Sequence, residues 1–183
     1  MKPITTVDHV FELLATGGGA AYFGETGSVL EHSLQAAWFV QRSDAGVALV
    51  AAALLHDLGH LVHTEGEDAA QRGLDTRHEE LAVEALAGHL PDSVLDPIRM
   101  HVAAKRYLCF AEPKYLAGLS PASVESLALQ GGPMTVTEAE GYLALPHARD
   151  AIRLRRADDA AKVQGITVPG LETYRTLVSS LWS

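Results

Sequence analysis

The chain has 183 residues, 48% of them hydrophobic, which predicts a single domain over residues 1–183 that buries about two-thirds of its unfolded surface. The net charge of −9 argues against nucleic-acid binding, which needs a basic face, and no run reaches the ~20 apolar residues of a membrane span or resembles a secretion signal. The single cysteine, Cys109, excludes an internal disulfide and predicts a cytoplasmic protein.

Helix signals run along the chain, and strand signals are nearly absent. Ser28-x-x-Glu31 is a capping box that opens an apolar-periodic run, and Thr76-x-x-Glu79 opens another. Each box predicts the first turn of an amphipathic helix.

Between the two boxes, residues 45–57 are rich in alanine and leucine and have almost no polar face. This composition predicts a buried central helix, which Gly59 should end. The segments 17–27, 62–75, 111–114 and 131–133 are predicted to be loops, and residues 64–73 are predicted to be mobile at the surface or to act as a lid.

The second half of the chain carries further helix starts. The predicted helices are residues 93–107 after Pro91-Asp92, a helix capped by Ser120 with Pro121 at its first position, one opened by the capping box Thr135-x-x-Glu138, residues 147–162 after Pro146, and residues 171–181. We therefore predict an all-α fold.

Six imidazole and carboxylate side chains lie at helix ends or on helix faces: His32, His56, Asp57, His78, His101 and Asp158. Helix bundles build metal sites from side chains that converge from facing helices, and these donor types hold iron, manganese or zinc. Adjacent residues on a helix diverge by about a third of a turn, so Asp57 is a candidate bridge between two metal ions. Single histidines are more often structural, and we expect this of His9, His63, His89 and His147.

The order of these donors resembles the HD-domain superfamily, and His78 resembles the additional ligand of its two-metal branch. Four segments narrow the resemblance to the small HD-domain mixed-valent diiron oxygenases of organophosphonate catabolism. They are Tyr-Phe-Gly-Glu at 22–25, Leu-Glu-His-Ser-Leu-Gln-Ala-Ala at 30–37, His-Val-Ala-Ala-Lys-Arg-Tyr-Leu at 101–108 and Leu-Gln-Gly-Gly-Pro-Met at 129–134.

The resemblance implies a compact HD-type helical bundle with a dinuclear Fe(II)/Fe(III) centre in its core and O2 as co-substrate. It implies oxidative cleavage of the C–P bond of a small organophosphonate, a 1-hydroxyphosphonate with an amino or trimethylammonio group at C2. The products would be phosphate and glycine or glycine betaine. No obligate protein partner is evident.

Candidate substrate contacts surround these ligands. Lys105 follows His101 by one turn, and Arg155 precedes Asp158 by three residues; both spacings place a cation on the metal-facing side of its helix, where it could bind a dianion. Ordinary ion pairing at the surface is the alternative for both. Further hydrogen bonds are expected from His60, Ser123 and Gln130. The resemblance assigns Tyr22 and Glu25 to a loop over the open metal and the substrate ammonium.

Two other functions remain open at this point. A metal-dependent HD phosphohydrolase would act on a nucleotide or a phosphate monoester through metal-bound water and would not need O2. A non-catalytic regulatory HD module would bind a ligand or partner, although such modules often lose metal ligands that this chain retains.

Overall fold

The computed structural model describes residues 4–19, 27–62 and 76–183. All regular secondary structure in these residues is helical, which confirms the predicted all-α class. The elements are α1 (Val7–Gly17), α2 (Val29–Arg42), α3 (Val47–Leu55), α4 (Gly59–Val62), α5 (His78–Leu86), α6 (Asp92–Ala111), α7 (Pro113–Ala117), α8 (Pro121–Leu129), α9 (Val136–Leu143), α10 (Ala148–Ala160), the 3-10 helix η1 (Leu171–Tyr174) and α11 (Arg175–Leu181). No helix in this part of the chain is long and apolar enough to cross a membrane.

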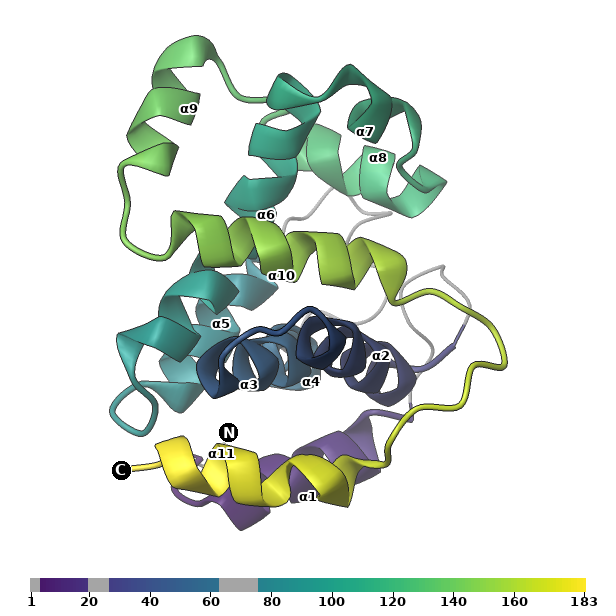
Figure 1. The fold of residues 1–183 in the computed structure, drawn as a ribbon, viewed down its shortest axis with the longest axis vertical. Helices are drawn as coiled ribbons and strands as arrows, with labels where there is room; N and C mark the ends of the chain where they lie inside the picture. The colour runs from purple at the N-terminus through teal and green to yellow at the C-terminus, as the bar shows by residue number, and fades with distance from the viewer. Residues whose placement is uncertain (1–3, 20–26, 63–75) are drawn as a thin grey trace.

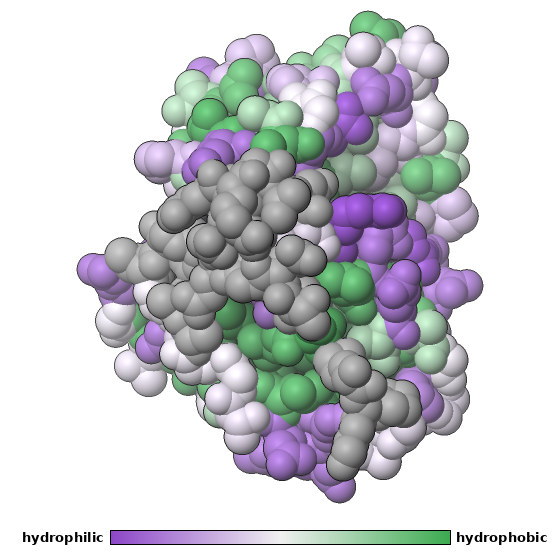
Figure 2. Space-filling model, turned by 180° about the vertical axis from the view of Figure 1, so that it is seen from behind, coloured by the Kyte–Doolittle hydropathy of each residue, from purple (hydrophilic) through white to green (hydrophobic). Residues whose placement is uncertain are grey.

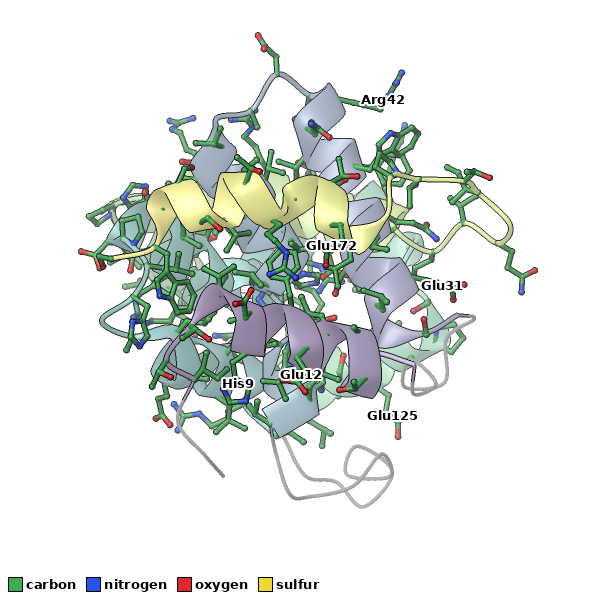
Figure 3. All side chains as sticks on the ribbon, turned by 90° about the horizontal axis from the view of Figure 1, so that it is seen from below. His9, Glu12, Glu31, Arg42, Glu125 and Glu172 are labelled. Carbon is green, nitrogen blue, oxygen red and sulfur yellow. The ribbon has the colours of Figure 1, made fainter. Side chains whose placement is uncertain are left out.

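Helix α3 lies at the centre of the fold. It consists of alanine, valine and leucine only, and its residues from Leu49 to Leu55 are all buried. Helices α2, α6 and α10 pack against it, and α11 covers it from below, side by side with α1 (Figures 1 and 3). A helix without a polar face is stable only in the interior, so the end of α3 places the residues that follow it deep in the protein.

A second, smaller core lies on the other side of α10, between α6 and α9 (Figure 1). Helix α6 joins the two cores, because Ile98 belongs to the main one while Met100 and Ala104 belong to the second. On the face seen in Figure 2, apolar residues gather near the centre and strongly polar residues gather to the right of them. Most of the exposed large apolar side chains in the described part of the chain lie between Phe110 and Leu145, around α7, α8 and α9.

Three of the predicted helix starts have the predicted geometry. Ser28 and Thr135 each form a complete capping box with the glutamate three residues later. Ser120 accepts a hydrogen bond from the backbone N–H of Ser123, and Pro121 takes the first helical position. These caps pair backbone N–H groups that a helix start leaves without partners.

The predicted capping box at Thr76 is wrong. Helix α5 begins at His78, after Arg77 in a left-handed conformation (φ 48°), and no side chain caps it. Glu79 is buried instead, with its Oε2 atom 3.5 Å from Nδ1 of His78. The carboxylate that the pattern assigns to the cap therefore lies against a candidate metal ligand.

Gly59 does not end a helix, contrary to the prediction. Helix α3 ends at Leu55, and α4 begins at Gly59. A Cβ atom on Gly59 would lie 1.8 Å from the carbonyl oxygen of His78. Only glycine allows the start of α5 to approach the turn after α3 this closely.

The remaining differences concern shorter elements and boundaries. Helices α1 and α7 lie outside the predicted elements; α7 has five residues, too few to show a helical period. Helix α6 continues to Ala111, α10 ends at Ala160, and the last predicted helix starts with the 3-10 turn η1. Most residues of the predicted loops lie outside the described residues, and these include Tyr22 and Glu25 of the first loop.

The contact at Gly59 yields the first prediction. Gly59→Ala should destabilise the metal-free protein by about 1–3 kcal/mol, because the new methyl group meets backbone atoms that cannot move independently. Urea unfolding measures the change. Gly141→Ala in α9 is the matched control: its Cβ meets nothing within 4 Å, so it should stabilise the protein by about 0.5–1 kcal/mol. Equal unfolding midpoints for the two variants would contradict the proposed role of Gly59.

Candidate metal centre

The six predicted donors come from five parts of the fold and meet at one place. His32 lies in the first turn of α2, His56 and Asp57 in the turn after α3, and His78 at the start of α5. The other two are His101, in the middle of α6, and Asp158, near the end of α10. All are buried except His78, which is partly buried.

One group of donors surrounds the Oδ2 atom of Asp57. The Nε2 atoms of His32 and His56 are 3.3 Å apart, and they lie 3.5 and 3.4 Å from this oxygen. Asp158 approaches from α10, with its Oδ1 atom 3.2 Å from Nε2 of His32. Two imidazoles and two carboxylates therefore face one point.

A second group surrounds the other oxygen of the same carboxylate. The Nε2 atoms of His78 and His101 are 3.1 Å apart, at 3.5 and 4.0 Å from Oδ1 of Asp57. His60, which the sequence assigns to substrate, lies beside this group: its Nε2 is 3.9 Å from the same oxygen and its ring stacks on that of His78. Asp57 thus turns one oxygen to each group, as a bridging carboxylate does.

Backbone carbonyl groups fix the imidazole rings. Nδ1 of His32, His56 and His101 lies 2.9, 2.9 and 2.7 Å from the carbonyl oxygens of Ala161, Ala53 and Ile98, respectively. With the proton held at Nδ1, each ring presents the lone pair of Nε2 to the cluster. The lone pairs of His78 and His101, which face each other at 3.1 Å, repel unless a cation lies between them, so this donor set fits metal ions.

The charge states of Asp57, His78 and His101 also suit metal binding, whereas at His32 burial lowers the pKa but the carboxylates of Asp158 and Asp57 outweigh it and raise it. Burial raises the pKa of Asp57, but the surrounding histidines, His56 and His60 foremost, outweigh it and lower the pKa well below its ordinary value. Burial lowers the pKa of His101 to about 4, and burial likewise lowers that of His78. An ionised carboxylate and neutral imidazoles are the forms that coordinate metal.

Gln35 supports this cluster, and the sequence did not reveal its role. Its side-chain amide donates to the carbonyl oxygen of Val163 (3.1 Å) and accepts from the N–H of the same residue (3.0 Å). These bonds hold the segment after α10, whose Ala161 carbonyl orients His32. The position of Gln35 three residues after His32 was the only available signal.

Both predicted cations lie beside the first group of donors. Lys105 is buried and donates to Oγ of Ser126 at 2.8 Å; burial, with the positive charge of Arg155, lowers its pKa to about 8. Arg155 is buried and forms a 2.8 Å ion pair with Oδ2 of Asp158. Neither side chain is at the surface, but Arg155 does pair with carboxylates of its own helix.

The structure places the two other predicted substrate contacts on and after α8. Ser123 is buried, and Nζ of Lys162 lies 3.4 Å from its Oγ and 3.5 Å from that of Ser120. The Oε1 atom of Gln130 is buried without a hydrogen-bond partner among the described residues. Lys162 and Ser126 were not among the predicted site residues.

The histidines expected to be structural lie outside the cluster where the structure describes them. His89 stacks on Trp182 with ring centroids 4.8 Å apart. His147 directly precedes α10, with its Nδ1 atom 3.8 Å from Oδ2 of Asp150, and His9 lies on α1 (Figure 3). His63 lies outside the described residues.

Comparison with known families agrees with this geometry. The HD-domain family model matches residues 29–136, a range that contains five of the six donors. The chain belongs to the HD-domain family. Asp158, the sixth donor of this HD-domain protein, follows the matched range.

Two curated relatives cover nearly the whole HD-domain chain. A hydroxymethylphosphonate dioxygenase of Gimesia maris is 41% identical over 97% of this chain and 89% of its own length. A 1-hydroxy-2-(trimethylamino)ethylphosphonate dioxygenase (glycine-betaine-forming) of Leisingera caerulea is 35% identical over 96% of this chain and 89% of its own. Both relatives are named as dioxygenases of phosphonates.

The two groups of donors yield the second prediction. Asp57→Asn should lower the content of both metal ions, because its carboxylate faces both groups, whereas His78→Ala should lower the content by about one ion per chain. Metal analysis after purification under iron-replete conditions measures this. His9→Ala is the control and should leave metal content unchanged. Unchanged content in Asp57→Asn would remove Asp57 as a bridge.

Proposed function

We propose that the protein is a diiron dioxygenase that cleaves the C–P bond of a 1-hydroxyphosphonate with O2. The observation that carries the proposal is a carboxylate shared between two groups of metal donors, next to two buried cations, Lys105 and Arg155. Iron is the metal that connects imidazole and carboxylate ligands to O2 chemistry. The names of both relatives support the reaction.

The reaction balances with O2 as the only oxidant. The C–P bond and the C1–H bond of the substrate supply the four electrons that reduce O2. One oxygen atom then ends in a carboxylate at C1 and the other in phosphate, with release of a proton. An amino or trimethylammonio group at C2 gives glycine or glycine betaine, and hydroxymethylphosphonate gives formate.

Each part of the site has a proposed role. His32, His56, Asp57, His78, His101 and Asp158 hold two iron ions, which supply the redox chemistry when bound. Lys105, Arg155, Ser123 and Gln130 bind the phosphonate oxygens by charge and hydrogen bonding, and His60 adds a contact beside the second ion. Tyr22 and Glu25 are proposed to face the rest of the substrate. The proposed location is cytoplasmic, where the lone Cys109 stays reduced.

The oxygen requirement is the third prediction. The iron-loaded protein is incubated with hydroxymethylphosphonate and with 1-hydroxy-2-(trimethylammonio)ethylphosphonate, in air and under anaerobic conditions, and phosphate is measured. Phosphate should form from at least one substrate only in air, together with the matching carboxylate. Equal phosphate release without O2 would instead establish a metal-dependent hydrolase.

The pKa of Lys105 provides the fourth prediction. Lys105 is charged below about pH 8 and neutral above it, so the KM for the phosphonate dianion should rise by about tenfold from about pH 7 to about pH 9. Lys105→Arg keeps its charge over this range, so its KM should change little with pH. The same rise in both proteins would show that another group titrates.

A further inference from the structure

Arg155 is held on two sides by consecutive carboxylates of its own helix. Its Nη1 atom pairs with Oδ2 of Asp158 at 2.8 Å. Its Nε atom lies 3.2 Å from Oδ2 of Asp159, and Nη2 pairs with the other oxygen of that carboxylate. Because Asp158 and Asp159 lie three and four residues after Arg155, both reach the same guanidinium.

A tyrosine from another helix completes this arrangement. Tyr115 lies in α7, and its hydroxyl donates to Oδ2 of Asp159 at 2.5 Å and accepts from Nε of Arg155 at 3.1 Å. Burial raises the pKa of Tyr115 above its ordinary value, so the hydroxyl keeps its proton and stays a donor. Arg155, Asp159 and Tyr115 therefore form a closed hydrogen-bonded ring.

The ring leaves part of the guanidinium for a ligand. The contacts with Asp158, Asp159 and Tyr115 use the Nε–H group and one N–H on each terminal nitrogen. A guanidinium has five N–H groups, so two remain among the contacts of the described residues. These two N–H groups can donate to an oxyanion, and the direction in which they point depends on the orientation of the guanidinium plane.

We propose that Asp159 and Tyr115 are positioning residues that hold the Arg155 guanidinium in the orientation that binds the substrate phosphonate. Helix α7 thereby takes part in substrate recognition without touching the substrate. The inference rests on the proposed function only in taking Arg155 as a phosphonate-binding residue.

A purely structural link between α7 and α10 is the alternative, and the chain contains a matched control for it. Glu112 directly precedes α7, and its Oε1 atom pairs with Arg156 of α10 at 2.6 Å. This ion pair connects the same two helices, but at the surface and without contact to Arg155. Glu112→Gln therefore removes a link of the same kind outside the ring.

The experiment measures the binding of inorganic phosphate to the iron-loaded protein by calorimetry under anaerobic conditions. The Kd should rise about tenfold in Asp159→Asn and about threefold in Tyr115→Phe, because each change frees a guanidinium that charged hydrogen bonds had fixed. Glu112→Gln should leave it within about twofold of the unchanged protein. Iron content should stay the same in all three variants.

A double-mutant cycle tests whether the two residues act through Arg155. In an Arg155→Lys background, which lacks the planar fork, Asp159→Asn should weaken phosphate binding by less than twofold. A full tenfold loss in that background would overturn the proposal. So would an equal loss in Glu112→Gln, or a fall in Tm of Tyr115→Phe with unchanged Kd. Tyr115→Phe keeps the aromatic side chain and removes only its hydroxyl. This variant therefore decides between the two explanations if Asp159→Asn does not fold.

Turnover separates this inference from the proposed function. In air, the positioning variants should raise KM for the phosphonate with little change in kcat. Because the phosphate measurement needs no turnover, absence of O2-dependent activity would reject the dioxygenase and leave the role of Asp159 and Tyr115 to be judged by the Kd values alone.

Discussion

The shared carboxylate of Asp57 is the constraint on which the rest of the structure depends. A buried ionised carboxylate is costly unless charged or hydrogen-bonding groups surround it. Here five histidines face its two oxygens, and metal ions between them would supply the compensating charge. Several features of the fold place these groups around Asp57. The apolar helix α3 ends beside it, Gly59 lets α5 approach, and backbone carbonyl groups fix the imidazole rings.

The first group of donors around Asp57 is connected to a network of charged side chains on α10. The first group includes Asp158, whose charge is shared with Arg155, and Arg155 in turn is held by Asp159 and Tyr115. A ligand of the metal site and a candidate phosphonate-binding cation therefore belong to one network. If Arg155 binds the phosphonate as proposed, substrate charge and metal charge would act on the same side chains, so the position of the phosphonate and that of a metal ion at the first group would be coupled.

The sequence predicted the helical class, three caps and six candidate donors that the structure brings together, because these depend on local spacing or on types of residue that are rare in a core. It could not predict contacts between distant segments. Gln35 holds the segment after α10 through a hydrogen bond to a residue 128 positions away. The hydrogen-bonded ring that contains Tyr115 likewise joins α7 to α10. Gly59 was misread for the same reason, since a glycine that admits a neighbouring helix looks in sequence like one that ends a helix.

The proposed site divides the substrate into two halves. The substrates named for the two relatives share a hydroxyl and a phosphonate on one carbon and differ only in the remaining substituent. One set of residues lies on helices or in the turn after α3, among packed side chains: the metal donors, Lys105, Arg155 and Ser123. Such a rigid setting suits binding of the hydroxyl and the phosphonate, the half of the substrate that does not vary. Recognition of the variable half then requires other residues, and the predicted roles of Tyr22 and Glu25 agree with this division. A dioxygenase of this type can thus change substrate without any change in the residues that hold the reacting bond.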